Sequence, residues 1–198
     1  MVFLGHYGTK KLFRILNTLF ALLLILNLPL KSYGNNSDSQ EYLIKAGFLY
    51  KFLFFVEWPT EVIMKSSDSI TIGILGRDPF GDAFEPIEGD IIHNRNIVIK
   101  HFEKNVSADY LKQCNLIFIS SSIKDNTETI LQSIKEYPVL TISEVAGFVD
   151  QGGMVNFIMK ENRVRFEINR EAAERVGIKF RSKLLRVAER VVGAGHAD

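Results

Sequence analysis

The side chains that most often carry catalysis or bind metals are few and scattered in this sequence. Its four histidines, His6, His93, His101 and His196, lie far apart, and no two of them have the spacing of metal ligands on one helix or strand. The single cysteine, Cys114, closes a predicted short helix and precedes an apolar strand, which predicts a buried and inert thiol. The sequence therefore predicts neither a metal site nor a cofactor.

Nucleophilic catalysis also lacks its usual signature. Ser120, Ser121 and Ser122 follow a predicted strand, where serines commonly satisfy the backbone of a turn, and the chain has no Gly-x-Ser-x-Gly motif. No nucleophile and base can be paired from the sequence. We therefore predict that the protein is not an enzyme, and a hydrolase is the least favoured of three functional hypotheses.

One segment has a composition that suits recognition. In residues 163–169, strand alternation places three apolar side chains on one face and Arg163, Arg165, Glu167 and Asn169 on the other. The default interpretation is a solvated face with a cross-strand ion pair, which contributes little to stability. The alternative is a polar recognition strip, because arginine can bind a carboxylate through two hydrogen bonds. The residue types alone leave both interpretations open.

A second candidate lies at the end of an unusually apolar helix, predicted for residues 41–58. Trp58 is the only tryptophan of the chain and stands between Glu57 and Pro59. A tryptophan at a helix end belongs either to the core or to an interface. The helix is apolar on most sides, so it is either fully buried in the monomer or partly used in self-association.

The elements around these residues predict one α/β domain. Apolar and β-branched runs predict strands at 69–75, 96–102, 116–120, 139–142, 154–159 and 163–169. Helical patterns between the first four indicate crossover connections and a partly parallel sheet. The polar junction at 160–162 predicts a C-terminal antiparallel hairpin. A final helix is predicted from Ser182 through Val192. The expected fold is a single compact domain, a mixed sheet of about six strands flanked by helices.

The beginning of the chain predicts export. Residues 1–14 are basic, residues 15–28 are almost wholly apolar, and small residues follow up to Gly34. This pattern is typical of a secretory signal peptide, and the apolar run is shorter than the roughly 20 residues of a membrane-spanning helix. We predict cleavage near Gly34, a signal peptide at 1–34 and a domain at 35–198. A single cysteine excludes an internal disulfide, and a formal net charge of +1 with mixed signs argues against a nucleic-acid partner.

Five stretches of the chain, in fixed order, resemble the YfiR/HmsC family of periplasmic regulators. They are IKAGFLYKFLFFVEWP at 44–59, ILGRDPFG at 74–81, CNLIFIS at 114–120, PVLTISEVAGFVDQGGMVNF at 138–157 and RVRFEINREAAERVGIKFRSKLLRVA at 163–188. Each stretch alone has little specificity, but their order behind a signal peptide is a specific match. The chain departs from some members in having no cysteine pair.

The resemblance implies a periplasmic protein that represses a membrane-bound diguanylate cyclase by binding its periplasmic domain, and so controls cyclic-di-GMP, biofilm and exopolysaccharide formation. It also implies a homodimer and a compact α/β domain. The expected partner is the periplasmic domain of a diguanylate cyclase or sensor kinase, with an outer-membrane lipoprotein as a further partner. The alternative is a periplasmic protein that binds an amino acid or carboxylate through the polar row of 163–169 and Trp58.

Overall fold

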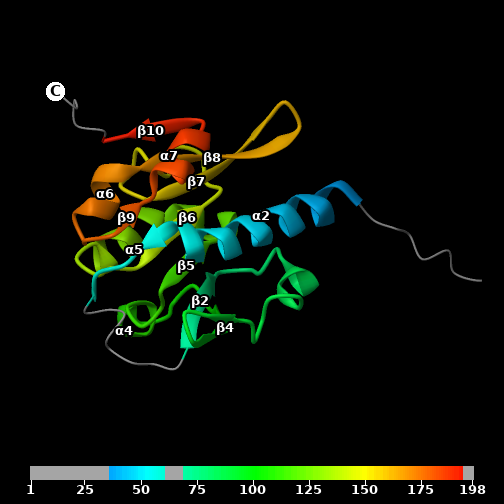
Figure 1. The fold of residues 1–198 in the computed structure, drawn as a ribbon, viewed down its shortest axis with the longest axis horizontal. Helices are drawn as coiled ribbons and strands as arrows, with labels where there is room; N and C mark the ends of the chain where they lie inside the picture. The colour runs from blue at the N-terminus through cyan, green and yellow to red at the C-terminus, as the bar shows by residue number, and fades with distance from the viewer. Residues whose placement is uncertain (1–35, 61–68, 194–198) are drawn as a thin grey trace, which may run out of the picture. The chain divides into compact units, whose positions relative to one another are not determined.

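A mixed sheet runs through the whole fold of residues 36–60 and 69–193, which are the residues that the computed structural model describes (Figure 1). Its eight strands lie in the order β10-β8-β7-β6-β5-β2-β4-β3. The predicted signal peptide lies outside the described residues. Residues from Ser37 onward form one compact unit, which confirms the prediction of a single domain.

The strands are β1 (Val56–Glu57), β2 (Ser69–Leu75), β3 (Ile91–Ile92), β4 (Arg95–Phe102), β5 (Leu116–Ile119), β6 (Leu140–Ser143), β7 (Val155–Lys160), β8 (Arg163–Asn169), β9 (Lys179–Phe180) and β10 (Arg190–Val192). The α-helices are α2 (Asn36–Phe55), α4 (Ala108–Leu111), α5 (Thr127–Ile134), α6 (Arg170–Glu174) and α7 (Ser182–Val187), and the 3-10 helices are η1 (Gly81–Phe84) and η2 (Ser121–Asn126).

The topology confirms the predicted class and adds two short strands. β4, β2, β5, β6 and β7 are mutually parallel, and β7 and β8 form the expected antiparallel hairpin. The sheet has eight strands rather than about six because β3 and β10, of two and three residues, are too short to produce a periodic pattern. β1 and β9 pair separately as a small antiparallel sheet.

Two predicted helices end earlier than expected. α2 stops at Phe55, and Val56 and Glu57 extend to pair with β9 instead of continuing the helix. α7 stops at Val187 because Ala188 has an extended backbone, and the next residues form β10 beside β8. In both places a tertiary strand pairing overrides the local helical pattern.

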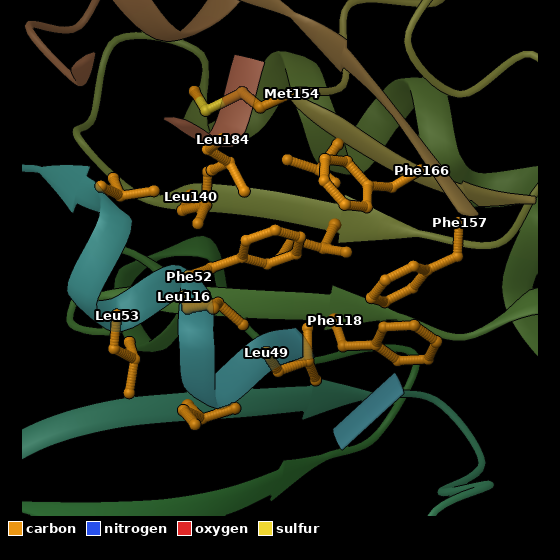
Figure 2. Packing of buried hydrophobic residues seen from close by; sticks show 14 of the residues in the cluster. Leu49, Phe52, Leu53, Leu116, Phe118, Leu140, Met154, Phe157, Phe166 and Leu184 are labelled. Carbon is orange, nitrogen blue, oxygen red and sulfur yellow. The ribbon is translucent and has the colours of Figure 1, made fainter. Parts of the chain in front are cut away.

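The main core lies between α2 and one face of the sheet (Figure 2). Leu49, Phe52 and Leu53 of α2 are buried against strand residues that include Phe118 and Phe166. Full burial of one such side chain contributes roughly 1.5–3 kcal/mol, so this contact determines where the helix lies. The outer side of α2 keeps Leu43 and Ile44 exposed, so the helix is only partly buried in the monomer.

A second core covers the opposite face of the sheet. Ile130, Leu131 and Ile134 of α5 pack there against strand residues such as Ile117 and Ile119. The sheet is therefore covered by helices on both faces, as the mostly parallel order of its central strands requires. Among the described residues, no helix has the length and apolarity needed to cross a bilayer.

Candidate functional site

The polar row of β8 has the alternation that the sequence predicted. Val164, Phe166 and Ile168 are buried, while Arg163 and Arg165 are exposed. Glu167 and Asn169 lie on the same side of the strand as the arginines but are half-buried. The row therefore has two parts: Arg163 and Arg165 are exposed and basic, whereas Glu167 and Asn169 are partly buried and make other contacts.

Asn169 is used by the fold. Its Oδ1 accepts the backbone N–H of Ala172 at 2.9 Å, so the side chain caps the N-terminus of α6. Its Nδ2 donates to the backbone carbonyl of Val149 at 2.8 Å. Both ends of the amide are engaged within the chain, which gives Asn169 a structural role.

Glu167 is also engaged, by an arginine that the sequence did not associate with it. Arg190 of β10 donates to both Glu167 oxygens at 2.8 and 3.1 Å, and to both Asp150 oxygens at 2.8 and 2.9 Å. The hydrogen bonds to Asp150 and Glu167 raise the pKa of Arg190, and those from Arg190 lower the pKa of Asp150. This double bidentate contact ties the last strand to β8 and to the loop before β7.

Arg163 and Arg165 form no ion pair with any side chain in the described part of the chain. They follow the β7–β8 turn, where Glu161 and Asn162 both have positive φ values of 50° and 58°, as a two-residue type I′ turn requires. Lys160, on the other arm, pairs with Glu189. The hairpin thus presents two exposed guanidinium groups that form no ion pair in the described chain, although the charge of Arg165 helps to lower the pKa of nearby Glu189.

Glu57 and Trp58 lie in a different place from the β8 row, at a pocket of about 270 Å³. Glu57 pairs across the small sheet with Lys179, and its Oε1 accepts Arg181 Nε at 2.9 Å. The pocket lining includes apolar Trp58 and Ile70 together with polar Glu57, His93, Arg95 and Arg181.

The indole of Trp58 is half-buried and packs against the main core. Its Nε1 is fully covered and has no hydrogen-bond acceptor among the described residues. Burying such a donor without a partner costs roughly 1–3 kcal/mol. The tryptophan is therefore partly a core residue, and it also lines a pocket in which two arginines, Arg95 and Arg181, outnumber the single carboxylate of Glu57.

The basic residues of this pocket were missed from the sequence. His93 and Asn94 have positive φ values of 51° and 64° and form the tight turn between β3 and β4, which brings His93 and Arg95 to the pocket. The signal was present in the sequence as a polar pair between two apolar runs. With Arg181, these groups can bind an anion whose apolar part contacts Trp58 and Ile70.

A second cluster, also missed, surrounds Glu144 just after β6. Lys45 of α2 donates to Glu144 Oε2 at 2.5 Å and also pairs with Glu41. Tyr42 Oη lies 3.1 Å from both Glu144 oxygens, and Ser121 Oγ donates to Oε1 at 2.9 Å. Burial, and then the Glu144 carboxylate, raise the pKa of the Tyr42 hydroxyl, which keeps it protonated as a donor.

The cluster fixes the first half of α2 to the carboxyl ends of the parallel strands. The Lys45 side chain is only 4% exposed, and that of Glu144 11%, although the two residues are 99 positions apart. A groove of about 440 Å³ runs beside them toward Met159 of β7. Each charge of the Glu144 cluster already has a partner within the chain. The first role of the cluster is therefore to position α2.

Other side chains that could do chemistry have ordinary surroundings. Cys114 is buried, as predicted, and burial raises the pKa of its thiol to about 11. His101 Nε2 lies 2.8 Å from Asp78 Oδ2 at the surface. Among the described residues, no three His, Cys, Asp or Glu side chains are grouped closely enough to hold a metal ion.

Comparison with known proteins identifies relatives by sequence and by fold. A family model described as YfiR/HmsC-like matches residues 42–189. A search of curated proteins finds no match. Among solved structures, the fold is similar to that of a conserved domain protein from Vibrio cholerae O1 biovar El Tor, with a TM-score of 0.51 and 11% sequence identity. That similarity covers 76% of this chain and 60% of the other, and it concerns the fold alone.

Proposed function

The chain belongs to the YfiR/HmsC-like family, and we propose that it represses a membrane-bound diguanylate cyclase, or a related sensor kinase, by direct contact in the periplasm. The family is regulatory rather than enzymatic, and its members are associated with cyclic-di-GMP signalling. The observation that supports the proposal most is the extent of the match, because residues 42–189 include nearly all of the described domain. The basic, apolar and small-residue pattern of residues 1–34 supports export.

The surface that best suits the contact is the exposed half of the β8 row. Arg163 and Arg165 are fixed on a hairpin and form no ion pair in the described chain, so binding a partner carboxylate would not require breaking an existing one. Glu167 and Asn169 are not part of this surface, because they already bind Arg190 and the α6 backbone.

The test is recovery of the partner from membranes. The tagged mature chain should recover a transmembrane diguanylate cyclase or sensor kinase from detergent-solubilised membranes of the native cell. Arg165→Ala should reduce that recovery without changing the thermal unfolding curve. Arg186→Ala is the matched control, because Arg186 is exposed on α7 and the change removes the same charge. Recovery of soluble proteins only would contradict the proposal.

Two further partners belong to this proposal. The proposal includes a homodimer, which light scattering of the mature chain would measure, and an outer-membrane lipoprotein that competes with the cyclase. The apolar side chains Leu43 and Ile44, exposed on α2, are compatible with association through that helix.

A second candidate function is binding of a small carboxylate or amino acid at the Trp58 pocket. The observation that favours it is a pocket of about 270 Å³ that Trp58, Arg95 and Arg181 line together, so that two guanidinium groups and an indole ring are available to one small ligand. Titration of Trp58 fluorescence with a panel of amino acids and small carboxylates tests it. A response that Arg95→Ala abolishes supports the site, and no response across the panel removes this candidate.

A further inference from the structure

Most of β4 forms an edge of the sheet at which the backbone has no neighbouring strand among the described residues. β4 is an eight-residue strand, and the two-residue β3 pairs only with Arg95 and Asn96 at its start. Two more hydrogen bonds cover Ile97, whose carbonyl accepts Gly89 N–H at 2.9 Å and whose N–H donates to the Asp90 carbonyl at 2.8 Å. Beyond Ile97, no described strand lies beside β4 on this side.

The direction of the free backbone groups follows from these bonds. The N–H and C=O of Ile97 point away from β2, and successive residues of a strand alternate between its two sides. Phe102 confirms the alternation, because its carbonyl accepts the N–H of Gly76 on the β2 side. The N–H and C=O of Ile99 and His101 therefore point outward. These two donors and two acceptors are available to hydrogen-bond with an added strand.

A second copy of the chain is a poor occupant of this edge. A two-fold axis at Lys100 would pair Ile99 with His101 of the other copy and use all four backbone groups. The same arrangement would place the exposed Lys100 directly opposite Lys100 of the other copy. Like charges in directly opposite positions destabilise a strand pair, and a lysine on an edge commonly prevents self-association.

The charges along the edge favour an acidic occupant. Neither Arg95 nor Lys100 forms an ion pair with another described side chain. The two residues are five positions apart, or about 17 Å along the strand. Asp78 is the carboxylate that would repel an acidic strand near this end of β4, and its Oδ2 already lies 2.8 Å from His101 Nε2. A strand that brings an acidic residue opposite Lys100 would gain both backbone hydrogen bonds and an opposite-charge pair.

We propose that β4 at Ile99–His101 binds an extended, acidic segment of a partner protein as an added strand. The identification of that segment with the regulated membrane protein rests on the proposed function. The binding mode itself depends only on the edge, because main-chain hydrogen bonds supply the affinity and the pairing with Lys100 supplies the selectivity.

The experiment uses the mature chain, labelled with ¹⁵N, and three heptapeptides of alternating threonine and valine. The first has a central glutamate, the second a central lysine, and the third is the glutamate peptide with alternate backbone nitrogens methylated. The glutamate peptide should shift the amide signals of Ile99 and His101 saturably and slow their exchange with solvent. The lysine peptide should bind about tenfold more weakly, and the methylated peptide should not bind.

Charge reversal on the protein provides the second arm. Lys100→Glu should make the lysine peptide the tighter ligand, whereas Lys124→Glu, at an exposed position of η2, should leave the original order unchanged. The proposal is wrong if the glutamate peptide leaves the Ile99 and His101 amides unperturbed, if those amides are already protected in the free chain, or if Lys100→Glu does not change the order.

The peptide result separates this proposal from the proposed function. Unchanged cyclic-di-GMP after deletion of the gene would remove the regulatory role, while saturable binding of the glutamate peptide would still support the edge. If the chain represses the cyclase in cells but the glutamate peptide does not perturb the Ile99 and His101 amides, the proposed function stands and the docking site on β4 is wrong.

Discussion

The position of α2 depends on a charge that is almost completely removed from water, and its removal should destabilise the domain. Lys45→Met keeps the length and apolar stem of the side chain but deletes the ammonium that lies 2.5 Å from Glu144 Oε2. Methionine fills nearly the same volume, so the cost of a cavity is small. The loss therefore reports chiefly the uncompensated Glu144 carboxylate, because Glu41, the other partner of Lys45, is more exposed to water.

The expected magnitude follows from burial. Breaking a buried ion pair from one side costs about 3–5 kcal/mol because the remaining charge has no partner. Glu144 is 11% exposed and keeps its hydrogen bonds from Tyr42 and Ser121, which offsets part of that cost. We expect a decrease of about 2–3 kcal/mol in the free energy of unfolding. For a domain of this size the midpoint of thermal unfolding falls by about 4–12 °C.

The assay is urea unfolding of the mature chain, followed by circular dichroism and by the fluorescence of Trp58. Lys51→Met is the matched control on the same helix, because Lys51 is exposed and only lies over the Tyr50 and Phe54 rings at 5.6 and 5.8 Å. That control should cost less than about 0.5 kcal/mol. The double variant Lys45→Met, Glu144→Gln should be more stable than Lys45→Met alone, because it no longer buries an unpaired charge.

Two results would refute the reasoning. The first is a cost for Lys45→Met no larger than that for Lys51→Met, which would mean that the cluster does not hold the helix. The second is a double variant less stable than the single one, which would mean that the Glu144 carboxylate is stabilising even without Lys45.

The two halves of the β8 row should respond differently to substitution. Asn169→Ala should lower the free energy of unfolding by about 1 kcal/mol through loss of the α6 cap, whereas Arg165→Ala should change it by less than about 0.5 kcal/mol. Equal effects of the two variants in urea unfolding would contradict the division of the row into a structural half and an exposed half. Because Arg190 lowers the pKa of Asp150 below its ordinary value of 3.8, this pair stabilises the fold above that pH and the contribution is lost as pH falls further. In Arg190→Ala the free energy of unfolding should therefore fall less steeply as the pH is lowered than it does in the original chain. The same steepness in both chains would argue against a stabilising Arg190–Asp150 pair. Burial raises the Cys114 thiol pKa from 9.0 to about 11, so the folded state retains a proton that the unfolded state releases, and stability declines as pH rises from 9 to 11. Cys114→Ala should flatten that decline, and rapid labelling of Cys114 in the native chain at pH 8 would show that the thiol is not buried.

Local patterns were sufficient to predict most of the fold. The β-branched runs identified the central strands, and the polar Glu161 and Asn162 identified the β7–β8 hairpin with its positive φ values. The alternation along β8 also placed its side chains on the correct faces. These features depend on residues close together in the sequence, where propensity and turn chemistry act directly.

The contacts that define the sites could not be predicted in the same way. The partner of Glu167 is Arg190, which stands beside Val191 and Val192 in a run that fits a continuing helix, although it forms β10. The partner of Lys45 is 99 positions away, and no local pattern relates the two. Such pairings arise from the topology of the sheet, which brings chain ends and helix starts to particular edges.

The regulatory role can be tested most directly by measuring cyclic-di-GMP in the native cell. The account predicts that deletion of the gene raises cyclic-di-GMP, that the full-length chain restores the original level, and that a chain without residues 2–34 does not. An unchanged level after deletion, or full restoration by the chain that lacks residues 2–34, would contradict a repressor that acts by contact in the periplasm.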